Sequence, residues 1–203
     1  MFFVKIPFWI KLFYPSLVWN KDRAEKKIYL TFDDGPNDTA TTYVLNELKR
    51  HNAFATFFCI GKNVESNADV YNRIINDGHT VGNHTQNHVN GWNVSCHEYL
   101  ENITKAKEKI DSTLFRPPYG RVKRSQIKAL KKMGFEIIMW DVLSGDFDLN
   151  LSNEDCLKNV LQNAQSGSII VFHDSEKAFS KLKYTLPKVL EHLSNKGFVF
   201  SSI

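Results

Sequence analysis

The chain has few cysteines and no strong excess of charge of either sign. Its 203 residues include three cysteines, an odd number at wide spacing, at Cys59, Cys96 and Cys156. That pattern excludes a disulfide framework or a zinc ribbon, and free thiols favour a reducing compartment. The net charge of +4 is too small to indicate a nucleic-acid-binding protein.

Residues 1–19 are rich in Phe, Trp, Ile and Leu but lack the features of a targeting segment. Lys5 and Lys11 interrupt the apolar residues, as do Pro7 and Pro15. No small-residue cleavage site follows, and the roughly 20 apolar residues of a membrane-spanning helix are missing. Two alternatives remain, a segment that packs on a domain or an aromatic and basic surface that contacts a membrane.

The chain also lacks internal repeats, low-complexity tracts and a Pro- or Ser-rich linker. We therefore expect one domain, residues 27–203, after an N-terminal segment of residues 1–26. Apolar runs predict strands at 27–32, 55–60, 79–82, 113–116, 135–140, 168–172 and 198–201. Helical patterns predict helices at 40–51, 69–77, 95–112, 125–133, 153–165 and 179–195, the last kinked or split at Pro187.

Strands that alternate with helices in this way predict a parallel α/β sheet. A complete eight-fold barrel typically needs about 250 residues, more than this chain has. An incomplete seven-stranded (β/α) barrel fits the number of strands, and an open doubly wound sheet is the competing arrangement.

Charged and imidazole side chains follow five of the predicted strands. They are Asp33, Asp34, His84, Arg116, Asp141, Asp146, His173 and Asp174. Because active sites in parallel α/β folds lie at the carboxyl ends of the strands, we expect these residues to share one face. Neither core packing nor solvation would require five strands to deliver such groups to one face.

The stretch Thr31–Pro36 places two adjacent carboxylates, Asp33 and Asp34, at the end of the first strand. Adjacent like charges repel and Asp is unfavourable in strands, although Asp, Gly and Pro are also ordinary residues of a solvated turn. The alternative is that Asp34 holds a cation while Asp33 takes a proton from the bound water. Arg116 would orient Asp33, or it forms a purely structural ion pair.

His84 and His88 are four residues apart, which on a helical turn would place both imidazoles on one side. With a carboxylate from another strand they form a set that leaves positions open for water or substrate, as catalytic metal sites do. Thr85 stands where a metalloprotease motif carries Glu, so Asp33 is the candidate base. The same set describes a non-haem iron oxygenase, although the alternation of strands and helices counts against that activity.

Two more groups are candidates for catalysis. His173 must be charged to protonate a leaving group, and Asp146 is suited to raise its pKa. The stiff turn Pro117–Gly120 can hold the main-chain N–H of Tyr119 as an oxyanion donor, or it is an ordinary turn. Asp174 is expected to cap the following turn.

Five motifs together resemble the polysaccharide deacetylase family, the NodB homology domain of carbohydrate esterase family 4. In chain order they are Thr31–Pro36, His84-Thr85-x-x-His88, Arg116–Gly120, Asp146-Phe147 and Val171-Phe172-His173. The resemblance implies a deformed seven-stranded (β/α) barrel with a divalent metal, often zinc. It also implies removal of an N-acetyl, or sometimes an O-acetyl, group from a sugar of peptidoglycan or a chitooligosaccharide.

The resemblance implies a role for each matched residue. Asp33 would be the base, held by Arg116, and His173 the acid, tuned by Asp146. The metal ligands would be Asp34, His84 and His88, the Tyr119 N–H would face the oxyanion, and Phe147 and Val171 would line the acetyl pocket. The family often has Trp and Leu at these last two positions, so the size of the substrate is open.

Two other functions remain open, an O-acetyl sugar esterase with the same site and a catalytically weak sugar-binding protein. The expected partner is an acetylated carbohydrate and not a nucleic acid. Residues 1–20 are a candidate for peripheral membrane contact, and a monomer is expected. Without a readable export signal, a cytoplasmic or membrane-peripheral location is favoured, while the substrate class also allows the cell envelope.

Overall fold

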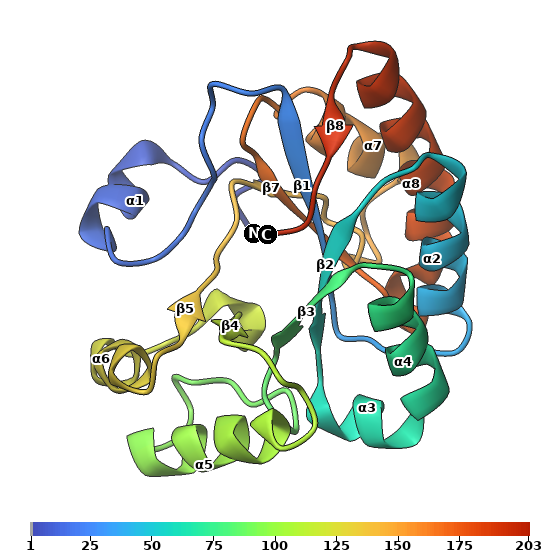
Figure 1. Ribbon diagram of the computed structural model, residues 1–203. Helices are drawn as coiled ribbons and strands as arrows, with labels where there is room; N and C mark the ends of the chain where they lie inside the picture. Colours follow the sequence, from blue (N-terminus) through green and yellow to red (C-terminus); the bar gives the residue numbers. More distant parts are fainter. Residues whose placement is uncertain (1) are drawn as a thin grey trace.

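A curved parallel sheet forms the centre of the molecule, which a computed structural model describes for residues 2–203 (Figure 1). Its strands are β1 (Lys27–Asp33), β2 (Ala55–Cys59), β3 (Thr80–Asn83), β4 (Leu114–Phe115), β5 (Glu136–Ile137), β6 (Val142–Leu143), β7 (Ile169–His173) and β8 (Val199–Phe200). Seven strands follow the order β5-β4-β3-β2-β1-β7-β6, all parallel, and β8 pairs with the start of β1. The predicted deformed seven-stranded (β/α) barrel is confirmed.

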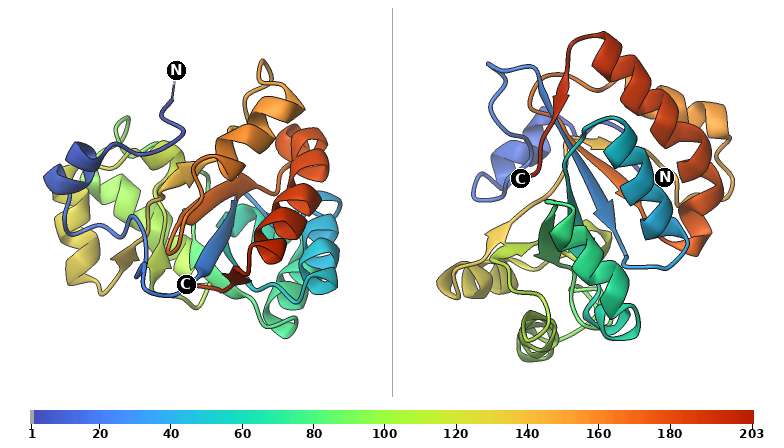
Figure 2. Two further views of the ribbon diagram at one scale, coloured as in Figure 1. Left: turned by 90° about the horizontal axis from the view of Figure 1, so that it is seen from above. Right: turned by 45° about the vertical axis from the view of Figure 1, so that its right-hand side comes forward.

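Helices surround the sheet on its outer side (Figures 1 and 2). They are α1 (Phe8–Phe13), α2 (Ala40–Arg50), α3 (Gly61–Ser66), α4 (Ala68–Asn76), α5 (Cys96–Lys107), α6 (Arg124–Lys132), α7 (Asn153–Leu161), α8 (Glu176–Asn195) and the short 3₁₀ helix η1 (Pro118–Gly120). The sequence did not predict α3, which follows β2 almost directly. Within residues 2–203, no helix is long and apolar enough to cross a membrane.

The barrel is open between β5 and β6. The strand predicted at 135–140 is shortened to Glu136–Ile137, which pairs with β4. Val142–Leu143 forms a separate strand after it, which pairs with β7. Residues of the N-terminal segment lie at this seam, where Val18 pairs with Ile138 and Asn20 pairs with Ser168. The seam is therefore filled by chain that precedes the barrel in the sequence.

Local interactions explain several element boundaries. Ser95 caps α5, since its Oγ accepts a hydrogen bond from the Glu98 N–H at 3.1 Å. Phe32 of β1 stacks on Phe57 of β2 and Phe172 of β7, with ring centroids 5.1 and 6.0 Å apart. These buried rings join the three central strands, whose carboxyl ends carry much of the site.

The predicted split of the last helix at Pro187 does not occur, because α8 runs without interruption from Glu176 to Asn195. Proline lacks the N–H that would bond to the carbonyl four residues earlier, that of Lys183. The hydroxyl of Tyr43 on α2 donates to this carbonyl at 3.2 Å instead. A side chain from a neighbouring helix thus replaces the bond that the sequence removes.

Candidate active site

Asp33 ends β1 and lies buried against Arg116, which follows β4. Nη1 of Arg116 donates to Asp33 Oδ1 at 2.7 Å and also to Thr31 Oγ1 at 2.7 Å. The carbonyl oxygens of Ile138 and Met139 accept the remaining hydrogen bonds of the guanidinium. Burial lowers the pKa of Arg116, and the Asp33 charge opposes that effect. The geometry fixes Oδ1 of Asp33 and leaves Oδ2 without a bond to the guanidinium.

Asp34, His84 and His88 come together within one small volume, with one potential ligand atom from each within 4.8 Å of the others. The Nε2 atoms of His88 and His84 lie 3.1 and 3.7 Å from Asp34 Oδ1. Nδ1 of His84 donates to the carbonyl oxygen of Arg116 at 2.8 Å, so its Nε2 keeps a free lone pair. Burial lowers the pKa of His84 to about 4, which keeps the imidazole neutral at pH 7.

The carboxylate of Asp34 has an oxygen without a well-aligned hydrogen bond. Oδ1 is buried and accepts none from the described residues, although His88 is in contact with it. Burial by itself would raise the pKa of Asp34, but the His88 contact and the charge of His173 hold it well below its usual range. Because buried polar atoms are normally paired, an ionised oxygen that faces the neutral imidazole of His84 fits a divalent cation.

The two histidines do not lie on a helical turn, as their spacing suggested, but on the loop after β3. Thr85 (φ 65°) and His88 (φ 54°) have left-handed backbone conformations, and so do Asp34 (φ 81°) and Tyr119 (φ 58°). Such conformations cost on the order of 1–3 kcal/mol in residues other than glycine and cluster at functional sites. Left-handed turns, and not helical periodicity, therefore bring the imidazoles together.

His173 ends β7 and is held by Asp146, a completely buried residue after β6. Asp146 Oδ2 accepts from the His173 backbone N–H at 2.7 Å, and Oδ1 accepts from Nδ1 of the ring at 2.8 Å. Burial disfavours the imidazolium, but the charge and hydrogen bond of Asp146 outweigh burial and raise the pKa of His173 to about 9. His173 is therefore charged at neutral pH and can act as an acid.

These groups open into a cavity of about 490 Å³ at the carboxyl ends of the strands. Tyr119, Phe147 and Val171 line it, as do Asp33, Asp34, His84, His88 and His173. The ring of Tyr119 lies 4.6 Å from that of His88, and the Phe147 ring meets His173 edge to face at 5.1 Å. The site residues singled out from the sequence thus surround or directly support one cavity, while Arg116 and Asp146 lie behind its wall.

Asp174 does not cap the following turn, which corrects the sequence interpretation. Its Oδ1 accepts from the Gly35 N–H at 3.0 Å, and the Thr41 hydroxyl donates to Oδ2. A Cβ at Gly35 would lie 2.0 Å from this carboxylate, which explains the glycine after the two aspartates. Burial raises the pKa of Asp174 to about 7.

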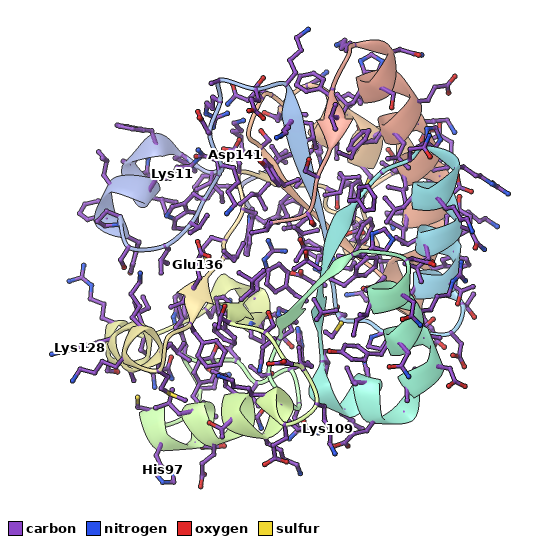
Figure 3. The ribbon with its side chains drawn as sticks, in the orientation of Figure 1. Lys11, His97, Lys109, Lys128, Glu136 and Asp141 are labelled. Atoms are coloured by element: carbon purple, nitrogen blue, oxygen red, sulfur yellow. The ribbon has the colours of Figure 1, made fainter. Side chains whose placement is uncertain are left out.

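Asp141 does not lie on the same face as the other candidate residues, which also corrects the sequence interpretation. It precedes β6, at the amino end of that strand, and its side chain is completely buried. Lys11 lies beside it (Figure 3) and contacts Oδ1 at 2.7 Å, while Lys5 and Ser168 contact Oδ2 at 3.0 and 2.7 Å. The error arose because the strand predicted to run to residue 140 already ends at Ile137, and a separate strand, β6, begins directly after Asp141.

The sequence interpretation also missed Phe2, which lines the cavity. Its ring lies 5.2 Å from that of Phe147. The aromatic composition of the first residues was visible in the sequence, but no local pattern places a terminal residue beside a loop more than 140 residues later.

Comparison with known proteins agrees with this geometry. The polysaccharide deacetylase family model matches residues 20–138. A peptidoglycan-N-acetylglucosamine deacetylase of Bacillus cereus is 33% identical over 193 residues, covering 92% of this chain and 91% of that protein. A chitooligosaccharide deacetylase of Azorhizobium caulinodans is 32% identical over 157 residues, 74% of each chain.

A crystal structure of a peptidoglycan N-acetylglucosamine deacetylase has the same fold, with a TM-score of 0.90 at 32% identity. The similarity covers 98% of this chain and 95% of that one. The fold, the motifs and the extent of these matches agree over nearly the whole molecule. The chain therefore belongs to the polysaccharide deacetylase family and is a carbohydrate-deacetylating hydrolase.

Proposed function

We propose that this carbohydrate deacetylase removes the N-acetyl group of N-acetylglucosamine-type residues in peptidoglycan or a related oligosaccharide. The names of its relatives support the substrate class, since they include peptidoglycan-N-acetylglucosamine deacetylases and a chitooligosaccharide deacetylase. The main support for the proposed reaction is that two candidate proton carriers, each with its own charged partner, lie around one cavity. Asp33 is paired with Arg116, and His173 is paired with Asp146.

The metal that we propose is zinc, held by Asp34, His84 and His88. When bound, such a metal polarises the acetyl carbonyl and lowers the pKa of water toward about 7. The neutral state of His84 and the ionised state of Asp34 are the protonation states that ligands require.

Asp33 is the proposed base that takes the proton from the attacking water. Its Oδ1 is fixed by Arg116, so its Oδ2 has a defined direction for proton transfer. The guanidinium is fully buried and bonded to two carbonyl oxygens, so it holds Asp33 in place without moving itself. The main-chain N–H of Tyr119 is the proposed donor to the developing oxyanion.

His173 is the proposed acid that protonates the departing amine. An amine is a poor leaving group unless it receives a proton, and a charged imidazole at neutral pH supplies one. Asp146 keeps Nδ1 engaged, which directs Nε2 toward substrate. Phe147 and Val171 form apolar wall beside His173 and are the proposed contacts of the acetyl methyl group.

Acetate release from a panel of N- and O-acetylated oligosaccharides, with chelator and with added zinc, tests this function. We expect acetate from N-acetylglucosamine oligomers, loss of activity with chelator and recovery with zinc. Release from O-acetylated sugars alone would contradict N-deacetylation, and full activity after complete metal removal would contradict the proposed zinc site.

A further inference from the structure

The N-terminal segment forms an additional edge of the sheet next to the site. Lys5 pairs with Val142 of β6 in antiparallel fashion, on the side of β6 that does not face β7. The Leu143 N–H donates to the Val4 carbonyl at 2.8 Å, and the Ile6 N–H donates to the Asp141 carbonyl at 3.1 Å. This pairing fixes the backbone direction of residues 4–6, and with it the position of the residues just before them.

Side-chain contacts hold the same segment in place. Lys5 Nζ donates to the carbonyl of Asn163 at 2.7 Å and to Asp141 Oδ2 at 3.0 Å, and Lys11 Nζ donates to Asp141 Oδ1 at 2.7 Å. Because the Asp141 carboxylate is completely buried, its two bonds to lysine are shielded from water on the Asp141 side. The start of the chain is thus attached independently of the catalytic groups.

This attachment brings the ring of Phe2 to the cavity wall. The ring centroid lies 5.2 Å from that of Phe147, which in turn contacts His173. A Cβ on Gly145 would lie 2.8 Å from Phe2 Cζ, so the glycine gives the ring room to approach this loop. Phe2 and Phe147 therefore make one continuous aromatic wall beside the proposed acid.

We propose that Phe2 is a specificity-determining residue, which with Phe147 holds the sugar ring that carries the acetyl group. Aromatic rings suit this task because a pyranose presents apolar C–H groups on its face. Phe2 carries no titratable or ligating group, so its effect falls on binding and not on the chemical step. This inference rests on the proposed function.

The test compares Phe2→Ala with Phe3→Ala, using an N-acetylglucosamine tetramer and acetate release. Phe3 is a matched control, because it is the adjacent phenylalanine and is 55% exposed. We expect Phe2→Ala to raise KM about fivefold with kcat nearly unchanged, and Phe3→Ala to change neither. Phe2→Trp, which keeps an aromatic ring, should have the KM of the wild-type protein. Equal melting temperatures should show that all three variants are folded.

Equal KM values for Phe2→Ala and the wild-type protein would overturn the role of Phe2. A fall in kcat without a change in KM would overturn it as well, because that result indicates disturbed catalytic geometry. Absence of acetate release by the wild-type protein would instead contradict the proposed function, so the two failures are distinguishable.

A second, independent observation concerns α1, whose outer face is apolar. Phe8, Trp9, Leu12 and Phe13 are between 55% and 73% exposed, while Ile6, Ile10 and Tyr14 pack inward on the core. A helix that is apolar on both faces needs a second contact, because large exposed apolar patches mark binding surfaces.

A helix rich in basic residues, α6, lies near α1. The guanidinium of Arg124 at the start of α6 lies 5.8 Å from the Tyr14 ring centroid, and α1 and α6 share one core cluster. Both helices lie on the left side of the barrel in Figure 1. The exposed basic residues of α6 are Arg124, Lys128, Lys131 and Lys132.

From this combination we infer that the α1 face rests on an anionic lipid bilayer surface. Aromatic side chains enter the interfacial region of a bilayer, and neighbouring cations attract anionic headgroups. A symmetric dimer through the same face is the weaker alternative, because it would bring basic residues of the two copies together.

Sedimentation with phosphatidylglycerol and phosphatidylcholine vesicles tests this inference. We expect binding to the anionic vesicles, and at least about tenfold weaker binding for the double variant Trp9→Ser/Phe13→Ser. Trp92→Ser is the matched control, since Trp92 is 57% exposed and lies on another loop, and it should bind as the wild type does. No vesicle binding by the wild type, equal binding by all variants, or a dimer that only the double variant disrupts would overturn the inference.

Discussion

Two carboxylates, the buried Asp141 and the half-buried Asp34, lie at opposite ends of the barrel strands and differ in how completely they are paired. Asp141 precedes β6 and has Lys5, Lys11, Arg23 and Ser168 around its two oxygens. Asp34 follows β1 and leaves Oδ1 without a well-aligned hydrogen bond from the described residues. The comparison separates a carboxylate that holds the fold together from one that is prepared for a ligand.

The pKa values of the two residues show why charge alone does not distinguish them. Burial would raise both, but hydrogen bonds from Lys11, Ser168 and Lys5 lower the pKa of Asp141 to about 2. Asp34 also lies below its usual range, because of His88 and His173. Both residues are ionised at pH 7, so the difference lies in which partners remain available.

The largest expected effect comes from the residue beside Asp34. Asp33→Asn should reduce acetate release by about 10³-fold, because the amide cannot accept the proton of the attacking water. Zinc content, measured on the same sample, should be unchanged, since Asp33 is not in the ligand set. Normal turnover by this variant would contradict the assignment of Asp33 as base.

Asp141→Asn should destabilise the fold. Removing the charge leaves three cations around a neutral amide, and we expect the free energy of unfolding to fall by about 3 kcal/mol. For a chain of this size that corresponds to a melting temperature lower by roughly 6–12 °C. Asp38→Asn, at an exposed aspartate in a turn, is the matched control and should melt like the wild type.

Acid titration should show the same contribution without a mutation. The pKa of Asp141 is lowered in the folded state, so its stabilisation is complete above the unfolded pKa of about 3.9 and is lost as pH falls through about 2. A shift of this size contributes on the order of 2 kcal/mol. The free energy of unfolding, measured with urea between pH 5 and pH 2, should therefore fall more steeply with decreasing pH for the wild type than for Asp141→Asn. Identical slopes would refute the assignment.

The smallest effect is expected for Asp146→Asn, which tests whether His173 is the acid. The charge of Asp146 raises the pKa of His173, so its loss should lower that pKa toward that of an ordinary histidine. Activity that needs protonated His173 is present below its pKa and is lost as pH rises through it. The alkaline limb of kcat should move to lower pH by about two units, with roughly tenfold less activity at pH 8. An unchanged limb would show that another group is the acid.

The sequence predicted that the candidate site residues gather at one end of the barrel, because the signals for this are local. Asp33, Asp34, His84, Arg116 and His173 each follow a strand that its own apolar run reveals, and parallel strands bring these ends together. The spacing of His84 and His88 was informative for the wrong reason, since left-handed turns replace the expected helical turn.

The structural end was not predictable in the same way. Lys5 and Asp141 are 136 residues apart, and no periodicity in either segment refers to the other. The predicted strand at 135–140 keeps its pairing with β4 only to Ile137, because Ile138 pairs with Val18 instead. The end of β5 is therefore set by tertiary contacts. The same holds for α8, where Tyr43 on another helix satisfies the carbonyl that Pro187 leaves without a donor.

The antiparallel pairing of residues 4–6 with β6 has a consequence for how the molecule is made. The ribosome synthesises these residues well before their partners at 141–143, which emerge only after most of the barrel. Until then residues 4–6 have no strand to pair with, and the aromatic wall of Phe2 and Phe147 beside His173 is incomplete. Maturation of the substrate pocket is therefore a late step of synthesis, and a nascent chain arrested before β6 would carry the proposed metal ligands without the finished pocket.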